Sequence, residues 1–307
     1  MSEQSTPVTA RPRDGYDAAW KAAIERFTEA FMVLLFPEIH RGIDWSVPPE
    51  FLDQELLPLT ADERGAVRRG VVDRLFRVRR VSGEDAAVLV HVEVQARRDE
   101  RFAERMFFYH YRIYDKHAQL ARDGRAAAPP VSLAVLADDR RDWRPACYDH
   151  GLWGCELLFA FPTVKLLDFV GREAELEASS NPFAQLVLAQ LSALRTRRKR
   201  NRRAHVMLQL VPRLLRHGWS RDDILDVYKF LSWIMALPVE LQRPIDTAMA
   251  REIEERGMPY LTVWEQKGLE QGLEQGEQRG ARRSVVKALE VRFGAVPDGV
   301  TAALEAI

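Results

Sequence analysis

Cysteine is nearly absent from this 307-residue chain, which contains only Cys147 and Cys155. Two cysteines in this length do not build a disulfide framework and fit a reducing compartment better. Near the N-terminus the longest apolar stretch, residues 31–36 before Pro37, is far shorter than the roughly 20 residues that span a bilayer. Residues 1–17 lack the basic start and apolar core of a secretory signal. We therefore expect a cytoplasmic protein with no membrane partner.

An excess of charge is also missing, because 45 basic and 45 acidic residues leave a net charge of zero. Bulk charge therefore does not identify a nucleic-acid binder, and only local clusters can do so. The densest basic cluster, residues 195–203, is either a solvated link or a phosphate-binding segment. The chain has no glycine-rich phosphate loop with its lysine and no Gly-x-Ser-x-Gly motif, which excludes the usual ATPase and serine-hydrolase sites.

Two apolar segments, residues 71–80 and 86–96, have the composition of strands joined by a hairpin turn at Gly83. Pairing them about this turn sets Asp73 opposite Glu93. Like charges in directly opposite positions destabilise a strand pair by roughly 0.2 to 1 kcal/mol. A bound divalent cation would explain why two carboxylates occupy these positions, although carboxylates on the solvent side of a hairpin are also common.

The side chains of this hairpin alternate between an apolar and a more polar face. The apolar face is predicted to carry Val88, Val90, Val92 and Val94 against Phe76 and Val78. The opposite face carries Leu89, His91, Glu93 and Gln95, so it becomes more polar toward the end of the second strand. On this face His91 is either an ordinary hydrogen-bonded residue of the sheet or a neighbour of the metal.

Further elements follow from apolar periodicity. We predict one helix over residues 17–35 and another over 101–120, whose buried stripe recurs at three and four residue steps. The apolar run 131–136 is predicted to be a buried strand that lies parallel to its neighbour after the helical crossover. Residues 154–161 are a further candidate strand.

The C-terminal half has helical patterns. Asn181-Pro182 is a start signal for a helix over residues 183–194, and Ser220 begins another that ends before Pro238. Four glycines then recur at a period of four within residues 261–283, among Glu, Gln and Arg residues that cannot lie in lipid. We interpret this segment as a marginal helical arm that packs on another helix. A terminal helical hairpin over 284–307 and self-association through the arm complete the prediction.

Three groups of residues are candidates for chemistry. Asp73 and Glu93 offer the hard oxygen ligands that Mg²⁺ or Mn²⁺ prefers, and the Gln95 amide can donate a hydrogen bond to an attacking water. A basic stripe on helix 101–120 either follows a DNA backbone or is a solvated face paired with neighbouring acids. Its members, within about 60° of one another on a helix, are Arg101, Arg105, Arg112 and Lys116. Cys147, His150 and Cys155 are either a zinc site with irregular spacing or ordinary packing residues.

The order of Asp73, then Glu93-x-Gln95, then the segment 101–106 resembles the PD-(D/E)XK nuclease core in its recombination-promoting nuclease and putative transposase branch. The likeness extends over about residues 16–300. It includes Ile43 to Ser46, Phe51 to Leu56, Tyr109 to Asp115, Asn181 to Ala184, and the glycine repeat followed by Arg292 to Gly294.

This resemblance implies an α/β fold with an α-β-β-β-α-β core, a mixed sheet flanked by helices, and an all-helical C-terminal region. With the composition and patterns above, we expect a disordered N-terminus at 1–15, which is rich in Ser, Thr, Pro and charge, a nuclease-like domain at 16–170, a helical region at 171–260 and the arm with its hairpin at 261–307.

The implied activity is Mg²⁺-dependent (or Mn²⁺-dependent) endonuclease action on DNA, associated with recombination. Asp73 and Glu93 would be metal ligands, and Gln95 would occupy the position of the superfamily lysine. A third carboxylate would come from Glu25, Glu29 or Glu55. The alternatives are a catalytically silent DNA-binding or protein-interaction module with the same fold, and an oligomeric scaffold built by the arm.

Overall fold

The computed structural model describes residues 13–52, 72–82, 87–122, 130–197 and 199–255. The chain divides into two compact units, 1–245 and 246–307. The described part of the second unit, residues 246–255, is the C-terminal part of helix α10 (Val239–Glu255). Within the described ranges, no helix has both the length and the apolar character needed to cross a membrane.

The first unit is built on a five-stranded mixed sheet with the strand order β1-β2-β3-β4-β7. The strands are β1 (Glu50–Phe51), β2 (Val72–Arg79), β3 (Ala87–Gln95), β4 (Pro130–Leu136) and β7 (Thr163–Lys165). β1, β2 and β3 pair antiparallel, whereas β4 lies parallel to both β3 and β7. The predicted mixed sheet and the parallel crossover to residues 131–136 are therefore confirmed.

The register of β2 and β3 agrees with the alternation in the sequence. Asp73 pairs with Glu93, Phe76 with Val90, and Val78 with Val88. Phe76, Val90, Val92 and Val94 are buried. The valine face is thus a core face, as the sequence predicted. The opposite face is buried as well, since His91, Glu93 and Gln95 expose 0%, 0% and 7% of their surface.

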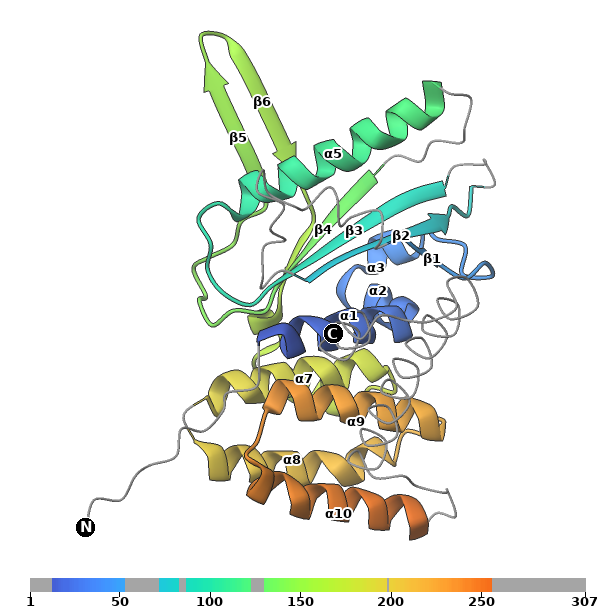
Figure 1. Cartoon of the computed structure of the whole chain (residues 1–307), viewed down its shortest axis with the longest axis vertical. Helices are drawn as coiled ribbons and strands as arrows, with labels where there is room; N and C mark the ends of the chain where they lie inside the picture. Colours follow the sequence, from blue (N-terminus) through green and yellow to red (C-terminus); the bar gives the residue numbers. More distant parts are fainter. Residues whose placement is uncertain (1–12, 53–71, 83–86, 123–129, 198, 256–307) are drawn as a thin grey trace, which may run out of the picture. The chain divides into compact units, whose positions relative to one another are not determined.

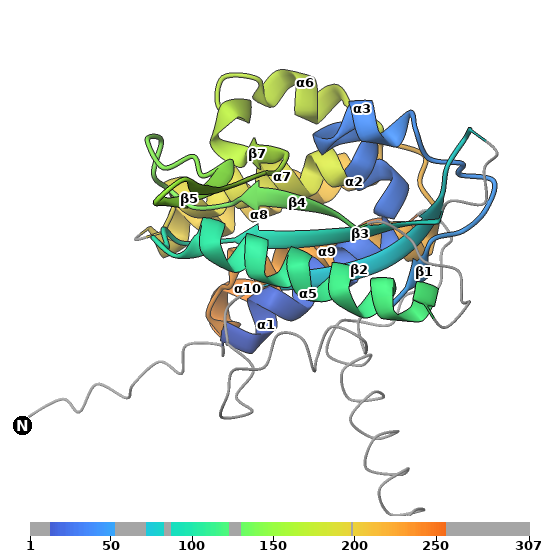
Figure 2. The same ribbon diagram turned by 90° about the horizontal axis from the view of Figure 1, so that it is seen from above.

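Helices cover both faces of this sheet (Figure 1). α5 (Phe102–Arg122) lies across the polar face, where the rings of His91 and Tyr109 meet edge to face. α1 (Arg13–Arg26) lies on the other side, where Arg74 donates to the carbonyl of Lys21. Figure 2 shows the same arrangement from above. The remaining helices are α2 (Thr28–Leu35), α3 (Pro37–His40), η1 (Leu166–Phe169), α6 (Glu173–Ala178), α7 (Pro182–Arg195), α8 (Arg200–Leu214) and α9 (Arg221–Met235).

The single helix predicted over 17–35 is wrong, because the helix breaks at Phe27 (φ −125°, ψ 41°) into α1 and α2. The Thr28 hydroxyl donates to the carbonyls of Ile24 and Glu25 at 2.8 and 3.0 Å. Hydroxyls that bond back to the preceding turn bend helices. Thr28 accounts for the break, which apolar periodicity alone does not reveal.

The helical region after η1 packs on α1. The Trp20 ring lies 5.9 Å from Phe183 of α7 and 5.4 Å from Phe230 of α9. Asn181 and Ser220 cap α7 and α9, since their side-chain oxygens accept from the backbone N–H groups two and three residues on. The predicted helical C-terminal region and both helix starts are confirmed. The predicted disorder of residues 1–15 is wrong at 13–15, which belong to α1. Residues 1–12, the glycine repeat and the terminal hairpin lie outside the described residues.

Candidate functional site

Glu93 lies near the C-terminal end of β3, where α5 covers the sheet, and no part of its surface is exposed. The Arg105 guanidinium of α5 donates to Glu93 Oε1 from Nε at 2.9 Å and from Nη2 at 2.6 Å. Arg105 itself is 6% exposed. On the neighbouring strand, Asp73 occupies the position directly opposite Glu93. This end of the sheet therefore combines two facing acidic positions with a buried cation.

Arg105 also contacts two polar residues that follow Glu93 in the sequence, Gln95 and Asp99. Its Nη2 donates to Gln95 Oε1 at 3.0 Å, and its Nη1 bonds to Asp99 Oδ2. The Gln95 amide nitrogen donates to the carbonyl of Arg97 at 2.7 Å. Both ends of the Gln95 amide are thus engaged within the protein. An amide nitrogen has two donors, so Gln95 can make one further hydrogen bond.

The electrostatics of the buried pair favour the ionised forms. Burial alone would lower the pKa of Arg105, but the charge of Glu93 and the hydrogen bonds to Asp99 and Glu93 outweigh it, and the pKa is raised. Removing one partner of a buried ion pair destabilises proteins by about 3 to 5 kcal/mol, because a buried charge is left without compensation. The ion pair with Glu93 therefore keeps the buried Arg105 charged.

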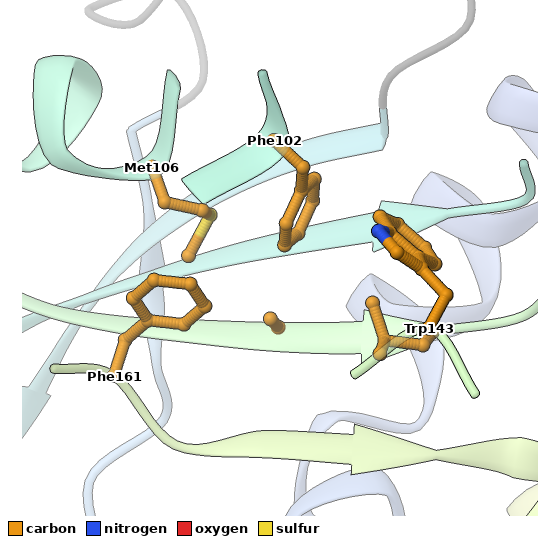
Figure 3. Close-up of a cluster of buried hydrophobic side chains, with 6 residues drawn as sticks. Phe102, Met106, Trp143 and Phe161 are labelled. Carbon is orange, nitrogen blue, oxygen red and sulfur yellow. The ribbon is translucent and has the colours of Figure 1, made fainter. Parts of the chain in front are cut away.

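An apolar cluster keeps the start of α5 on the sheet (Figure 3). It joins Phe102 and Met106 of α5 with Trp143 and Phe161, and the Phe102 and Trp143 rings meet edge to face at 5.6 Å. The Arg105 guanidinium lies 5.4 Å from the centre of the Phe102 ring. This packing determines where Arg105 lies relative to β3.

A second buried ion pair lies beyond β4 on the same face of the sheet. Gln95 pairs with Leu136, and Leu136 pairs with Lys165 of β7. The Lys165 ammonium bonds to Asp138 Oδ2 and donates to the carbonyl of Trp143 at 3.1 Å. Lys165 and Asp138 are each about 1% exposed at their side chains. Phe102 and Trp143 thus separate two buried cation–carboxylate pairs.

Two histidines share the hydroxyl of Ser132 beneath α5. His91 Nδ1 lies 3.3 Å and His110 Nδ1 3.0 Å from Ser132 Oγ. Burial lowers the pKa of His110 to about 4, and the nearby His91 contributes to this shift. His110 is therefore neutral at neutral pH, with a hydrogen-bonding role. His91 is a hydrogen-bonded residue of the sheet, one of the two interpretations that the sequence left open.

The candidate third carboxylates lie elsewhere or outside the described residues. Glu25 accepts a 2.6 Å hydrogen bond from Arg74. Arg74 is the residue after Asp73 on β2, so it belongs to the opposite face of the sheet, the one that carries the valines. Glu29 is exposed and lies 3.5 Å from a His40 ring nitrogen. Glu55 lies outside the described residues. Among the described residues, no group of three His, Cys, Asp or Glu side chains could hold a metal ion.

The predicted basic stripe divides into one buried and three more accessible members. Arg105 belongs to the Glu93 network and is not on an open surface, which corrects the prediction of a continuous stripe. Arg101 is exposed and pairs with Glu104 at 2.7 Å. Arg112 lies over the Phe108 ring at 4.4 Å, and Lys116 is half-buried. Arg105 is buried because it lies one turn after Phe102 on the side of the helix that faces the sheet, where it meets the Glu93 carboxylate.

The two remaining candidate groups are the two cysteines with His150 and the basic cluster at residues 195–203. Cys147 and Cys155 are exposed free thiols on β5 (Cys147–Leu152) and β6 (Cys155–Ala160), and the register pairs them with Ala160 and Leu152. They do not form a metal cluster with His150 within the described part of the chain. In the basic cluster, Arg195 pairs with Glu173, Arg197 with Asp139, and Arg203 donates to the carbonyls of Ala193 and Met235.

The sequence did not lead us to predict that Arg105 and Asp99 form one hydrogen-bonded network with Glu93. A signal was present, because Arg105 directly precedes Met106 of the buried stripe and follows Phe102 by three residues. A basic residue at the margin of an apolar helix face is a candidate partner for a carboxylate on the covered strand. The Lys165–Asp138 pair gave no such signal, since 27 residues separate its members.

Comparison with known families gives one match. Residues 62–145 match the family described as putative transposase, YhgA-like. The matched segment contains β2, β3, α5 and β4, and thus Asp73, Glu93, Gln95 and Arg105. Neither the curated proteins nor the solved structures give a match. The match supports the putative-transposase part of the resemblance over residues 62–145, and with it an association with mobile elements; it does not extend to the PD-(D/E)XK superfamily or to the C-terminal segment.

Proposed function

We propose that the chain is a metal-dependent DNA endonuclease with a PD-(D/E)XK-type core, associated with recombination or mobile elements. The observation that carries the proposal is the register that pairs Asp73 with Glu93 beside Gln95 on one sheet face. The order of helix, three strands, helix and parallel strand supports it, as does the match to putative transposases over residues 62–145.

The donor set at this end of the sheet fits a hard divalent cation. Asp73 and Glu93 would hold Mg²⁺ or Mn²⁺, ions that prefer carboxylate oxygens and keep water in their remaining positions. Such an ion, when bound, activates water for attack on a phosphodiester and offsets charge in the transition state. Both hydrogen bonds from Arg105 to Glu93 go to Oε1, so they fix the orientation of the carboxylate.

Arg105 and Gln95 divide the roles that a single lysine would have in the superfamily. Arg105 brings the positive charge to the carboxylates, but its high pKa prevents it from acting as a base. Gln95 contacts Arg105 and has one remaining amide donor that could orient the attacking water or a phosphate oxygen. Arg105 is thus a positioning residue in this proposal, and Gln95 is the residue closest to the chemistry.

DNA contacts would come from the more accessible basic residues at and near the start of α5. Arg101 directly precedes this helix, and Arg112 and Lys116 lie on it. Lysine and arginine contacts to phosphates position a duplex without reading its sequence, and they make binding sensitive to salt. These residues therefore support binding of a nucleic-acid backbone next to the site.

A plasmid nicking assay tests the proposed activity. Purified full-length protein should nick supercoiled DNA with Mg²⁺ or Mn²⁺ and should not do so with EDTA. Asp73→Ala and Glu93→Gln should each lower the rate at least 100-fold. Glu100→Gln, which changes an exposed carboxylate close to the site in sequence, serves as the matched control. Nicking that survives both site substitutions would rule out this assignment.

One observation favours a second candidate, a catalytically silent DNA-binding module. Glu93 is already paired with Arg105, and both ends of the Gln95 amide are bonded within the protein. A site whose polar groups satisfy one another is also what a structural network requires. Salt-sensitive binding of DNA by the wild-type protein, without cleavage under any divalent cation, would support this candidate over the nuclease.

A further inference from the structure

The strands β5 and β6 form a separate two-stranded hairpin between β4 and β7 in the sequence. Figure 1 shows that it extends beyond α5 and away from the five-stranded sheet. Isolated two-stranded hairpins are marginally stable in water unless they pack against something else. The outer part of this one is apolar and exposed: Leu152, Trp153 and Leu158 expose 58%, 97% and 74% of their surface.

At the turn of the hairpin, Trp153 has a backbone conformation that is energetically unfavourable for a bulky residue. Trp153 has a φ of 53° and is followed by Gly154 with a φ of 83°. Glycine and asparagine adopt this backbone region readily, whereas for a bulky side chain it is an outlier. The indole is almost fully exposed, so it gives no packing energy to the described fold. A tryptophan in this position is better suited to contact another molecule.

A second apolar surface lies next to the hairpin on α5. Its outward side carries Phe108, Tyr111 and Tyr114, which are 48%, 53% and 56% exposed; we call these three residues the aromatic face of α5. The base of the hairpin joins this helix, because Phe107 stacks on Tyr148 with ring centres 5.4 Å apart. The same helix, α5, therefore carries the aromatic face and contacts the base of the hairpin.

The two surfaces differ in charge. The charged residues of the hairpin strands are Asp149 and Glu156, both acidic and exposed, and no ion pair to either occurs among the described residues. The aromatic face of α5 has charges of both signs around it, since Arg112 and Lys116 border it on one side and Glu104 and Asp115 lie beside its rings. The hairpin therefore matches this face through its exposed apolar side chains.

We propose that the hairpin of one copy of this chain docks on the aromatic face of α5 in a second copy. A two-fold arrangement would make the contact twice, since each copy supplies one hairpin and one α5. With about 150 to 250 Å² per aromatic side chain, the four exposed aromatic residues alone present roughly 500 Å² of each copy. The exposed leucines bring this close to the roughly 800 Å² that each partner contributes to a standard interface.

Nucleic acid fits the hairpin less well than a second copy does. The strands carry Asp149 and Glu156 and no lysine or arginine, so they would repel a phosphate backbone. A stacking platform for bases normally combines aromatic side chains with a positively charged groove. The hairpin has aromatic and apolar side chains but lacks that positive charge.

The mass of the full-length protein in solution, measured against concentration, tests the proposal. The wild-type chain should approach about 70 kDa, twice its 35.2 kDa. Trp153→Asn keeps a residue that tolerates the turn, and Tyr114→Arg changes an exposed helix position. Each should raise the dissociation constant of the dimer at least tenfold. Leu208→Gln, at an exposed leucine of α8, should leave it unchanged.

Mixing the two variants gives the sharpest outcome. Trp153→Asn retains an intact α5 and Tyr114→Arg an intact hairpin, so a mixture should form a heterodimer through one complete contact. A monomeric wild-type protein at all concentrations would overturn the proposal. Two further outcomes would also overturn it. In one, both variants dimerise as strongly as the wild type; in the other, Trp153→Asn keeps the mass of the wild type but no longer binds DNA. Dimer formation only after removal of residues 256–307 would show instead that this segment covers the surface.

Discussion

Arg105 links the elements of the candidate site, because its guanidinium contacts Glu93, Gln95 and Asp99 at once. Asp99 lies just before α5 and also accepts from the backbone N–H of Arg101 at 3.0 Å. The start of the helix and the end of β3 are therefore joined by one cation. Any change of Arg105 should affect both the fold and the site.

Replacing Arg105 with alanine should destabilise the protein by about 3 to 5 kcal/mol, because Glu93 would remain buried without its partner. Arg101→Ala, at the residue directly before the same helix, is the matched control. Arg101 and its partner Glu104 are 65% and 44% exposed, and exposed pairs contribute about 0 to 1 kcal/mol. Urea unfolding of the two variants measures the difference. Equal losses in both would contradict the structural role of Arg105.

His110 should make stability depend on pH between about 6.5 and 4. Its pKa in the folded protein is about 4, below the usual value near 6.5, so the unfolded chain binds a proton that the folded chain does not. The stabilising contribution of neutral His110 is complete above pH 6.5 and is lost as the pH falls toward 4. His110→Gln should flatten this part of the curve relative to exposed His205→Gln. Parallel curves would be inconsistent with a buried neutral His110.

At the scale of elements, strong periodicity predicted position and type well. The strands β2 and β3, the helix α5 and the starts of α7 and α9 lie where apolar patterns and capping residues indicated. The alternation of valines on β3 also agreed with the register with β2, since a slip of one residue would move the valines to the polar face. These features depend on neighbours in sequence, which is why one sequence was sufficient.

The caps of α7 and α9 should contribute unequally to stability. Ser220 Oγ accepts from the Asp223 backbone N–H at 3.1 Å, and Ser220→Ala should cost about 1 kcal/mol. Asn181 caps α7 and also donates to the carbonyl of Ala30 in α2 at 2.8 Å. Asn181→Ala should therefore cost roughly 2 kcal/mol, the cap plus one further hydrogen bond. Thermal unfolding would contradict this if Ser220→Ala were the more damaging change.

Features that depend on distant residues were not predictable. The segment 154–161 does contain a strand, β6, but it pairs with β5 outside the main sheet. Leu157 and Leu158 of this strand are exposed, and apolar composition does not distinguish a buried strand from a docking surface. Likewise, the burial of the polar face of β3 depends on α5 lying across it. Alternation identified that face but not what covers it.

At the scale of the whole chain, α5 connects the features on this side of the sheet. Its inner side holds Glu93 through Arg105, and its outer side carries the aromatic face that we propose as a dimer contact. The sequence predicted the facing pair Asp73 and Glu93 correctly in register. The sequence marked Arg105 as a candidate partner for some carboxylate, but the contact with Glu93 itself depends on the packing of Phe102 against Trp143.

Direct binding of Mn²⁺, followed by electron paramagnetic resonance, tests the central claim that Asp73 and Glu93 hold a divalent cation. The wild-type protein should bind Mn²⁺, and Asp73→Asn should weaken binding at least tenfold without disturbing Arg105. Asp222→Asn, at a carboxylate that is 75% exposed on α9, should bind like the wild type. Mn²⁺ binding that is absent in the wild type, or equal in Asp73→Asn, would contradict the account.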